Sequence, residues 1–172
     1  MNQIKSNYTY SKIFIEGFRE ESNEYLIVLD HEAIIVNQLT ETLSGRVFSK
    51  VIYEQALNEI IDLETSTIKK AFATYTPKNE ILLVEKETKT ILIEVKGRKI
   101  SLQVSEGDKI KPRQKIAYVL TKKFEVRSIK STNEGIVVYI GWVYEERPER
   151  YVIVVVNSND VRRLKLRKGA ST

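Results

Sequence analysis

The chain has 172 residues, of which 42% are hydrophobic and 30% are charged, so it can bury the core of one medium-sized domain or two small ones. It has no cysteine, which excludes disulfides, thiolate metal sites and cysteine nucleophiles, and the lack of a signal peptide or a bilayer-length apolar run predicts a cytoplasmic protein without a membrane anchor. The net charge of +5 is unevenly placed, because residues 1–86 carry nine Lys or Arg against thirteen Asp or Glu, whereas residues 87–172 carry nineteen against ten.

The first strands are predicted near the N-terminus. Residues 12–18 alternate apolar and polar side chains, which is typical of a half-buried strand. Two short β-branched runs, 25–30 and 33–36, are separated by a polar pair, so we expect them to form a hairpin.

A helix is predicted to follow these strands. Apolar residues recur at spacings of three or four over residues 48–63, which predicts one amphipathic helix; they are Phe48, Ile52, Ala56, Ile60 and Leu63. Neither period holds in the Thr-rich stretch 64–80, and we place a domain boundary there. Residues 1–79 are therefore expected to form a small N-terminal α+β domain.

From residue 80 onward the pattern changes to short strands alone. Seven apolar runs predict strands at 81–85, 90–95, 98–104, 115–120, 124–129, 135–143 and 151–156. Gly97 predicts a tight hairpin between the second and third of these strands. We expect an all-β domain over residues 80–160, followed by a basic C-terminal tail over residues 161–172.

The predicted tail concentrates positive charge that could contact the phosphates of a nucleic acid. The basic residues in it are Arg162, Arg163, Lys165, Arg167 and Lys168. No aromatic residues are interleaved with them, and no nucleic-acid motif accompanies them. We therefore expect a solvated chain end and keep nucleic-acid binding through the basic C-terminal half as an alternative.

One local motif is more specific than the rest. In the stretch VSEGDKIKPRQKIAYV, a strand ends at Val104, Gly107 and Asp108 turn the chain, Ile110 points back inward, and a new strand begins after Gln114. This wide turn resembles the hammerhead turn of biotinyl and lipoyl carrier domains.

The resemblance to carrier domains extends beyond this turn. Ile116 also matches the carrier pattern, whereas Arg113 replaces its second glycine, and the later stretch IKSTNEGIVVYI matches at Ile129, Gly135, Val137 and Ile140. The resemblance implies a C-terminal barrel-sandwich hybrid over about residues 88–157. Together with the predicted N-terminal domain, this gives an α+β chain. An acidic front joined to such a barrel is similar to an archaeal family of uncharacterised proteins, and the Lys-, Glu- and Ile-rich composition is thermophile-like.

Two adjacent lysines raise the question of a carrier function. Carrier domains are modified on a lysine at a hairpin tip, and the resemblance places that position opposite Phe124, one residue from Lys123. A shift of one residue turns a side chain to the opposite face of a strand. We therefore expect Lys122 and Lys123 to solvate the turn, and we keep a swinging-arm carrier modified on either of them as an alternative.

Aromatic and arginine side chains gather around the last strands of the barrel. Such residues are enriched at protein contact surfaces, so we predict a partner-binding face formed by Tyr139, Trp142, Tyr144, Arg147, Arg150 and Tyr151. In the alternative interpretation, Trp142 closes one end of the barrel core.

Motifs for catalysis, phosphate loops and metal sites are absent from the sequence. The single histidine, His31, lies between Asp30 and Glu32 at a predicted turn, where a polar surface triplet is expected. The sequence thus predicts a module without enzymatic activity, metal or cofactor that acts by protein–protein contact with an unidentified partner, or with further copies as a homo-oligomer.

Overall fold

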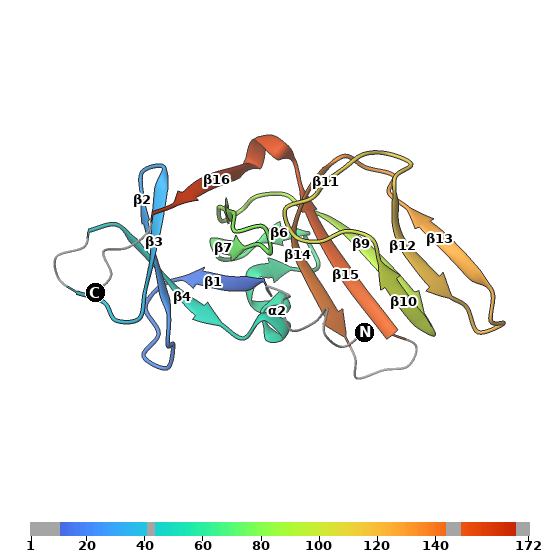
Figure 1. Ribbon diagram of the computed structural model, residues 1–172, viewed down its shortest axis with the longest axis horizontal. Helices are drawn as coiled ribbons and strands as arrows, with labels where there is room; N and C mark the ends of the chain where they lie inside the picture. Colours follow the sequence, from blue (N-terminus) through green and yellow to red (C-terminus); the bar gives the residue numbers. More distant parts are fainter. Residues whose placement is uncertain (1–10, 41–43, 144–148, 168–172) are drawn as a thin grey trace.

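The protein is almost entirely β-structure in the computed structural model, which describes residues 11–40, 44–143 and 149–167 (Figure 1). The strands are β1 (Lys12–Glu16), β2 (Tyr25–Leu29), β3 (Glu32–Val36), β4 (Arg46–Val51), β5 (Ile61–Asp62), β6 (Thr67–Ile68), β7 (Phe72–Tyr75), β8 (Ile81–Val84), β9 (Ile91–Gly97), β10 (Lys99–Leu102), β11 (Lys109–Ile110), β12 (Lys115–Leu120), β13 (Val126–Lys130), β14 (Gly135–Val143), β15 (Glu149–Val156) and β16 (Val161–Leu166). Within those ranges, the helical elements are the short turns η1 (Tyr53–Gln55), α2 (Leu57–Ile60) and η2 (Ser158–Asp160). In the part of the chain so described, no helix is long and apolar enough to cross a membrane.

A closed barrel occupies one end of the molecule. Its strands follow the order β1-β4-β2-β3-β16-β8-β7, and β7 pairs with β1 to close it. Neighbouring strands are antiparallel except β16 and β3, which are parallel. Side chains alternate across the wall: Phe14 fills the barrel interior, whereas Ile13 and Ile15 point outward into a second core.

Two further sheets lie beside the barrel. A four-stranded sheet, β11-β14-β15-β9, is in the middle of the molecule, and a three-stranded sheet, β10-β12-β13, forms the far end (Figure 1). The short pair β5–β6 contributes to the packing against the barrel. The molecule therefore consists of three layers.

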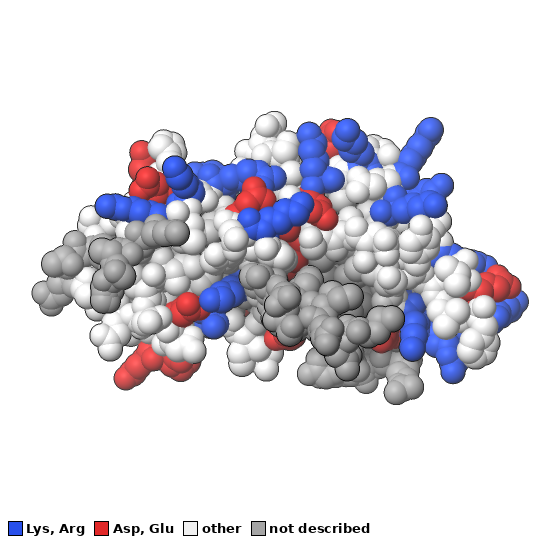
Figure 2. Space-filling model, in the orientation of Figure 1, with Lys and Arg blue, Asp and Glu red and all other residues white. Residues whose placement is uncertain are grey.

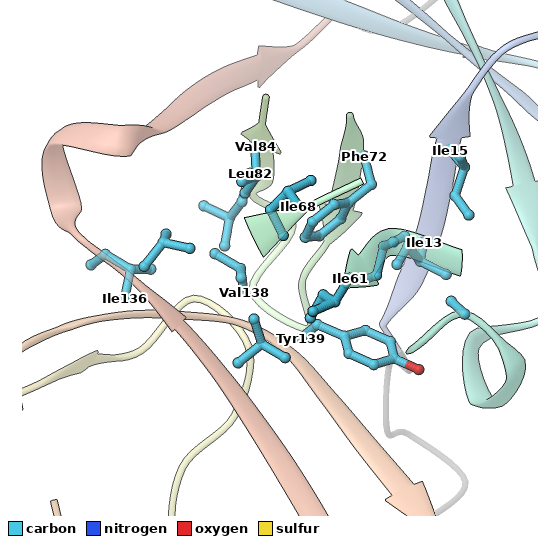
Figure 3. Close-up of a cluster of buried hydrophobic side chains, with 14 of the residues drawn as sticks. Ile13, Ile15, Ile61, Ile68, Phe72, Leu82, Val84, Ile136, Val138 and Tyr139 are labelled. Carbon is cyan, nitrogen blue, oxygen red and sulfur yellow. The ribbon is translucent and has the colours of Figure 1, made fainter. Parts of the chain in front are cut away.

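The middle sheet is buried on both faces, which explains its long apolar runs. Ile136 and Val138 of β14 pack toward the barrel, whereas Val137 packs toward the three-stranded sheet. Figure 3 shows the first of these cores, where side chains of β1, β7 and β8 meet those of β14. A buried hydrogen bond, from Thr74 Oγ1 to the carbonyl oxygen of Val138 at 2.7 Å, also joins the two layers.

The predicted α+β class is wrong, because no long helix forms over residues 48–63: the segment begins in β4 and ends in β5, with two single helical turns between them. Residues 46–51 form β4, which pairs with β1 on one side and β2 on the other, and only the single turns η1 and α2 follow. Ile52, which the helical pattern places on the buried face, is 59% exposed. Strand pairing on both sides, together with the β-branched Val47 and Val51, outweighs the helical spacing.

The expected basic tail is also corrected by the structure. Residues 161–166 form β16, which lies between β3 and β8 in the barrel and buries Leu164. The hairpin β7–β8 likewise continues the barrel across the boundary expected near residue 80.

Gly97 does not form the predicted hairpin. It ends β9 in the four-stranded sheet, and β10 begins two residues later in the three-stranded sheet, so the chain crosses between sheets there. A Cβ atom at Gly97 would lie 2.0 Å from Cγ1 of Val119, so close packing explains this glycine.

Candidate functional site

The lysine pair lies at the tip of the hairpin β12–β13. The turn is closed by two backbone hydrogen bonds, from Thr121 N–H to the Glu125 carbonyl at 2.8 Å and from Phe124 N–H to the Thr121 carbonyl at 2.9 Å. Lys122 and Lys123 are the two central residues of this turn, and both are exposed. The turn therefore presents two ammonium groups at the far end of the molecule.

Positive charge in this part of the chain is left largely uncompensated. Residues 97–131, which contain β10 to β13, carry ten Lys or Arg against three Asp or Glu, so their net charge of +7 exceeds the +5 of the whole chain. Among the described residues, Arg127 is the one of these ten cations with a carboxylate within 4.0 Å, at 3.9 Å from Glu125. Figure 2 shows Lys and Arg side chains around this end of the molecule.

Uncharged and aromatic side chains lie on the outer face of the three-stranded sheet. We call this surface the hairpin face; it is formed by the outward side chains of β10, β12 and β13 and by the turn between the last two. Tyr118 is 37% exposed on it, and its cross-strand neighbours are the small residues Ser101 and Ser128. Val126, at 70% exposure, lies beside Leu120 in the next row toward the tip. An apolar stripe therefore runs through a basic surface.

A cation lies against each exposed aromatic ring of the hairpin face. The guanidinium carbon of Arg98 is 4.6 Å from the centroid of the Phe124 ring, and Nζ of Lys115 is 5.8 Å from the centroid of the Tyr118 ring. These contacts are worth about 0.5–1 kcal/mol each at exposed sites. They orient the rings without burying them.

Two residues of this region adopt a backbone conformation that favours glycine. Phe124 has φ of 61° and Arg113 has φ of 73°, and both side chains are exposed. The left-handed region costs a side-chain-bearing residue roughly 1–2 kcal/mol, and a bulky residue there is uncommon. Neither residue recovers that cost by filling a core, so their side chains are candidates for contact with a ligand.

Arg46 in the barrel wall, by contrast, is paired. Arg46 forms ion pairs with Glu16 at 2.9 Å and with Glu85 at 2.7 Å. The hydrogen bonds to Glu85 and then Glu16 raise the pKa of Arg46 above its usual range, and the same guanidinium lowers the pKa of Glu85. These charges stabilise the barrel wall and are not available to an external anion.

Of the basic residues predicted to contact nucleic acid, some are paired in the structure and others are exposed. Arg163 is paired with Glu80 at 2.6 Å, and Arg162 donates to the carbonyl oxygen of Asp30 and lies 3.9 Å from Glu85. Lys165 and Arg167 are exposed beside β3 of the barrel, and Lys168 lies outside the described residues.

The predicted partner face is only partly at the surface. Tyr139 is fully buried, so it cannot contact a partner. Trp142 and Tyr151 are cross-strand neighbours with ring centroids 6.1 Å apart, and Trp142 is 39% exposed. Arg150 lies beside them and pairs with Glu94 at 3.4 Å. The other two members of the predicted face, Tyr144 and Arg147, lie outside the described residues, and the role of this face in protein contact stays a prediction.

A buried polar cluster joins the barrel layer to the sheets. The Tyr53 hydroxyl donates to Glu106 Oε2 and accepts from the Ile140 N–H at 3.1 Å, while the Tyr139 hydroxyl donates to the Tyr53 carbonyl at 2.5 Å. Burial first, and the Glu106 carboxylate second, raise the pKa of Tyr53 well above its ordinary value. The sequence contains no periodic signal for this cluster, since its members come from three distant segments.

His31, the single histidine of the chain, does not join a metal-binding group in the described ranges. His31 lies at the exposed turn between β2 and β3, 3.4 Å from Asp30, and no group of three His, Cys, Asp or Glu side chains there could hold a metal ion. The sequence did not predict the hairpin face as one surface, because the pairing of β10, β12 and β13 that forms it has no local signature. A charge count over residues 97–131 is the signal that could have found it.

Comparison with known proteins identifies the family of the chain. A search of curated proteins finds no match. The family described as uncharacterized proteins conserved in archaea (DUF2118) matches residues 8–158, a range that includes the hairpin face and every strand from β1 to β15. The chain therefore belongs to this family of uncharacterized archaeal proteins.

Proposed function

We propose that the protein is a non-catalytic binding module that holds a nucleic acid on its hairpin face. The observation that carries this proposal is the excess of ten basic over three acidic residues in residues 97–131, with one ion pair among the ten cations in the described structure. Unpaired surface cations attract phosphates and release condensed counterions on binding, which favours association with a polyanion. Exposed aromatic rings among the cations are the second feature that nucleic-acid surfaces use.

Salt-dependent binding tests this function and its location. We would measure the affinity of the full chain for a labelled oligoribonucleotide over a range of salt concentrations, using Lys122→Gln/Lys123→Gln as the test variant. The matched control, Lys165→Gln/Arg167→Gln, removes the same charge from exposed positions of the barrel. Each phosphate contact on a single strand contributes about 0.7 to the slope of log K against log salt, so loss of two contacts lowers the slope by about 1.4 and the affinity about 25-fold at 0.1 M salt.

Three outcomes would reject the proposal in different ways. If no oligonucleotide binds at low salt, the function is wrong. If the control weakens binding as much as the hairpin variant, the location is wrong. If the hairpin face binds an acidic protein and does not bind nucleic acid, it is a protein contact surface. Protein contact is also the function that the sequence predicts.

A swinging-arm carrier is the second candidate function, and one observation favours it. Lys122 and Lys123 are the central residues of an exposed hairpin turn, which is the position from which a carrier lysine of biotinyl or lipoyl type reaches a ligase. The turn departs from that pattern, because it presents two lysines followed by Phe124 in the left-handed region. Intact mass after co-expression with a biotin or lipoate ligase tests it: an unchanged mass removes the carrier function, and a mass increase lost in Lys122→Gln/Lys123→Gln supports it.

A further inference from the structure

We infer that the hairpin face binds a single-stranded nucleic acid by stacking bases on Phe124 and Tyr118, so that the ligand class is the single strand and not the duplex. This inference rests on the proposed function and adds the part of the ligand that is recognised. Phosphate contacts alone would leave both rings without a role.

The two rings are open to a planar ligand. Phe124 is 66% exposed, and Arg98 lies against its ring at 4.6 Å from the centroid. A guanidinium on one side of the ring leaves the other side available to a base, which gives an arrangement of cation, ring and base in series. Tyr118 is flanked on both neighbouring strands by serines, whose short side chains leave room beside the ring.

The backbone at Phe124 supports a role for its ring outside the fold. At φ of 61°, glycine or asparagine would fit this turn with less strain, and the Phe124 side chain is not part of any described core cluster. A phenylalanine therefore contributes little to the fold at this position that glycine would not. What it does supply is an exposed aromatic surface between Lys123 and Arg98.

Tyr118 and the turn that carries Phe124 lie along one hairpin. Tyr118 lies in the middle of β12, and Lys122 at the tip is four residues further, about 13 Å at the usual rise of a strand. Cations lie along this length, with Lys115 beside Tyr118 and Arg98 beside Phe124. A duplex keeps its bases stacked on one another, so it could contact the cations but could not place bases on these rings.

The test compares ligands that differ in their bases, using the full chain. The probes are a short mixed-sequence oligoribonucleotide, the oligodeoxyribonucleotide of the same sequence, the corresponding duplex, and inorganic polyphosphate, which carries charge without bases. The test variant is Phe124→Gly, and Phe124→Tyr is the rescue variant. Phe18→Gly is the matched control, because Phe18 is equally exposed, at 63%, but lies on the barrel.

We expect Phe124→Gly to weaken both single strands roughly five- to 150-fold, with Phe124→Tyr and Phe18→Gly close to the wild type. Polyphosphate should bind Phe124→Gly as it binds the wild type. Equal affinity of Phe124→Gly for the single strand, or tighter binding of the duplex, would overturn base stacking while leaving phosphate binding intact. Failure of every probe to bind would instead reject the proposed function itself. A difference between the two single strands would assign the ligand to RNA or DNA.

Discussion

Replacing Tyr53 by phenylalanine should destabilise the protein well beyond the loss of one hydroxyl. This hydroxyl donates to Glu106, which is only 8% exposed, and accepts the Ile140 N–H at 3.1 Å. Without it, a buried carboxylate loses its donor and a backbone N–H loses its acceptor. An unsatisfied buried group costs about 1–3 kcal/mol, so we expect the free energy of unfolding to fall by about 2–4 kcal/mol.

Urea unfolding of matched variants measures this effect. Tyr75→Phe is the control, because the Tyr75 hydroxyl also donates to a side chain, Asn79 Oδ1 at 3.0 Å, but does so in an exposed hydrogen bond. It should cost less than about 1 kcal/mol. The double variant Tyr53→Phe/Glu106→Leu removes the buried carboxylate together with its donor and should recover part of the loss. If Tyr53→Phe and Tyr75→Phe cost the same, the polar cluster does not stabilise the contact between the layers.

Two other predictions concern stability. Gly45→Ala should destabilise the barrel more than Gly17→Ala. Both glycines have positive φ, +150° at Gly45 and +119° at Gly17. Only at Gly45 would the new Cβ also approach a backbone oxygen, that of Val28 at 2.6 Å. We expect roughly 1–2 kcal/mol for Gly17→Ala from the backbone alone, and a larger loss for Gly45→Ala; thermal unfolding that ranks them in the reverse order would contradict this. The pKa values of Tyr53 and Tyr139 are raised in the folded state, so above about pH 10 these tyrosines ionise in the unfolded state while they stay neutral in the folded state. The free energy of unfolding should therefore be constant in this respect below about pH 10. Above it, the free energy of unfolding should fall by up to about 1.4 kcal/mol per pH unit for each tyrosine. Urea midpoints between neutral and alkaline pH test this, and a Tyr53→Phe variant with the full wild-type slope would refute the assignment to Tyr53.

Strand positions could be predicted from the sequence where β-branched runs are bounded by turns. The predicted hairpin of 25–30 and 33–36 is confirmed as β2 and β3, and the predictions for 115–120 and 135–143 coincide with β12 and β14. Ile110 is buried, as its place in the wide turn predicts. In these segments the local pattern and the tertiary environment agree, so periodicity alone was sufficient.

The helix over 48–63 shows where local pattern and pairing disagree. Phe48 fits both a helical stripe and a strand whose two faces are covered, and the sequence does not reveal that β1 and β2 lie on either side of β4. Ile52 then leaves the strand into solvent instead of continuing the stripe. Pairings between distant strands have no local signature, which is why the closed barrel could not be predicted.

The sequence predicted the basic character of the candidate site but not its position on the fold. Basic charge in the second half was visible from composition, and Lys122 and Lys123 were correctly singled out as turn residues. The exposure of Phe124 and the ring contact with Arg98 depend on the crossing between sheets at Gly97, which was expected to be a hairpin. The side of a sheet that faces solvent is decided by which layer covers the other side.

The position of β16 has a consequence for biosynthesis. This strand pairs with β8, and it pairs with β3 at Lys165 and Glu32, which are separated by more than one hundred residues of intervening chain. A nascent polypeptide that has emerged only as far as the middle sheet would still expose two open strand edges, and such edges invite pairing with other chains. The ribosome must therefore release the chain through β16 before the N-terminal strands can form a sealed wall.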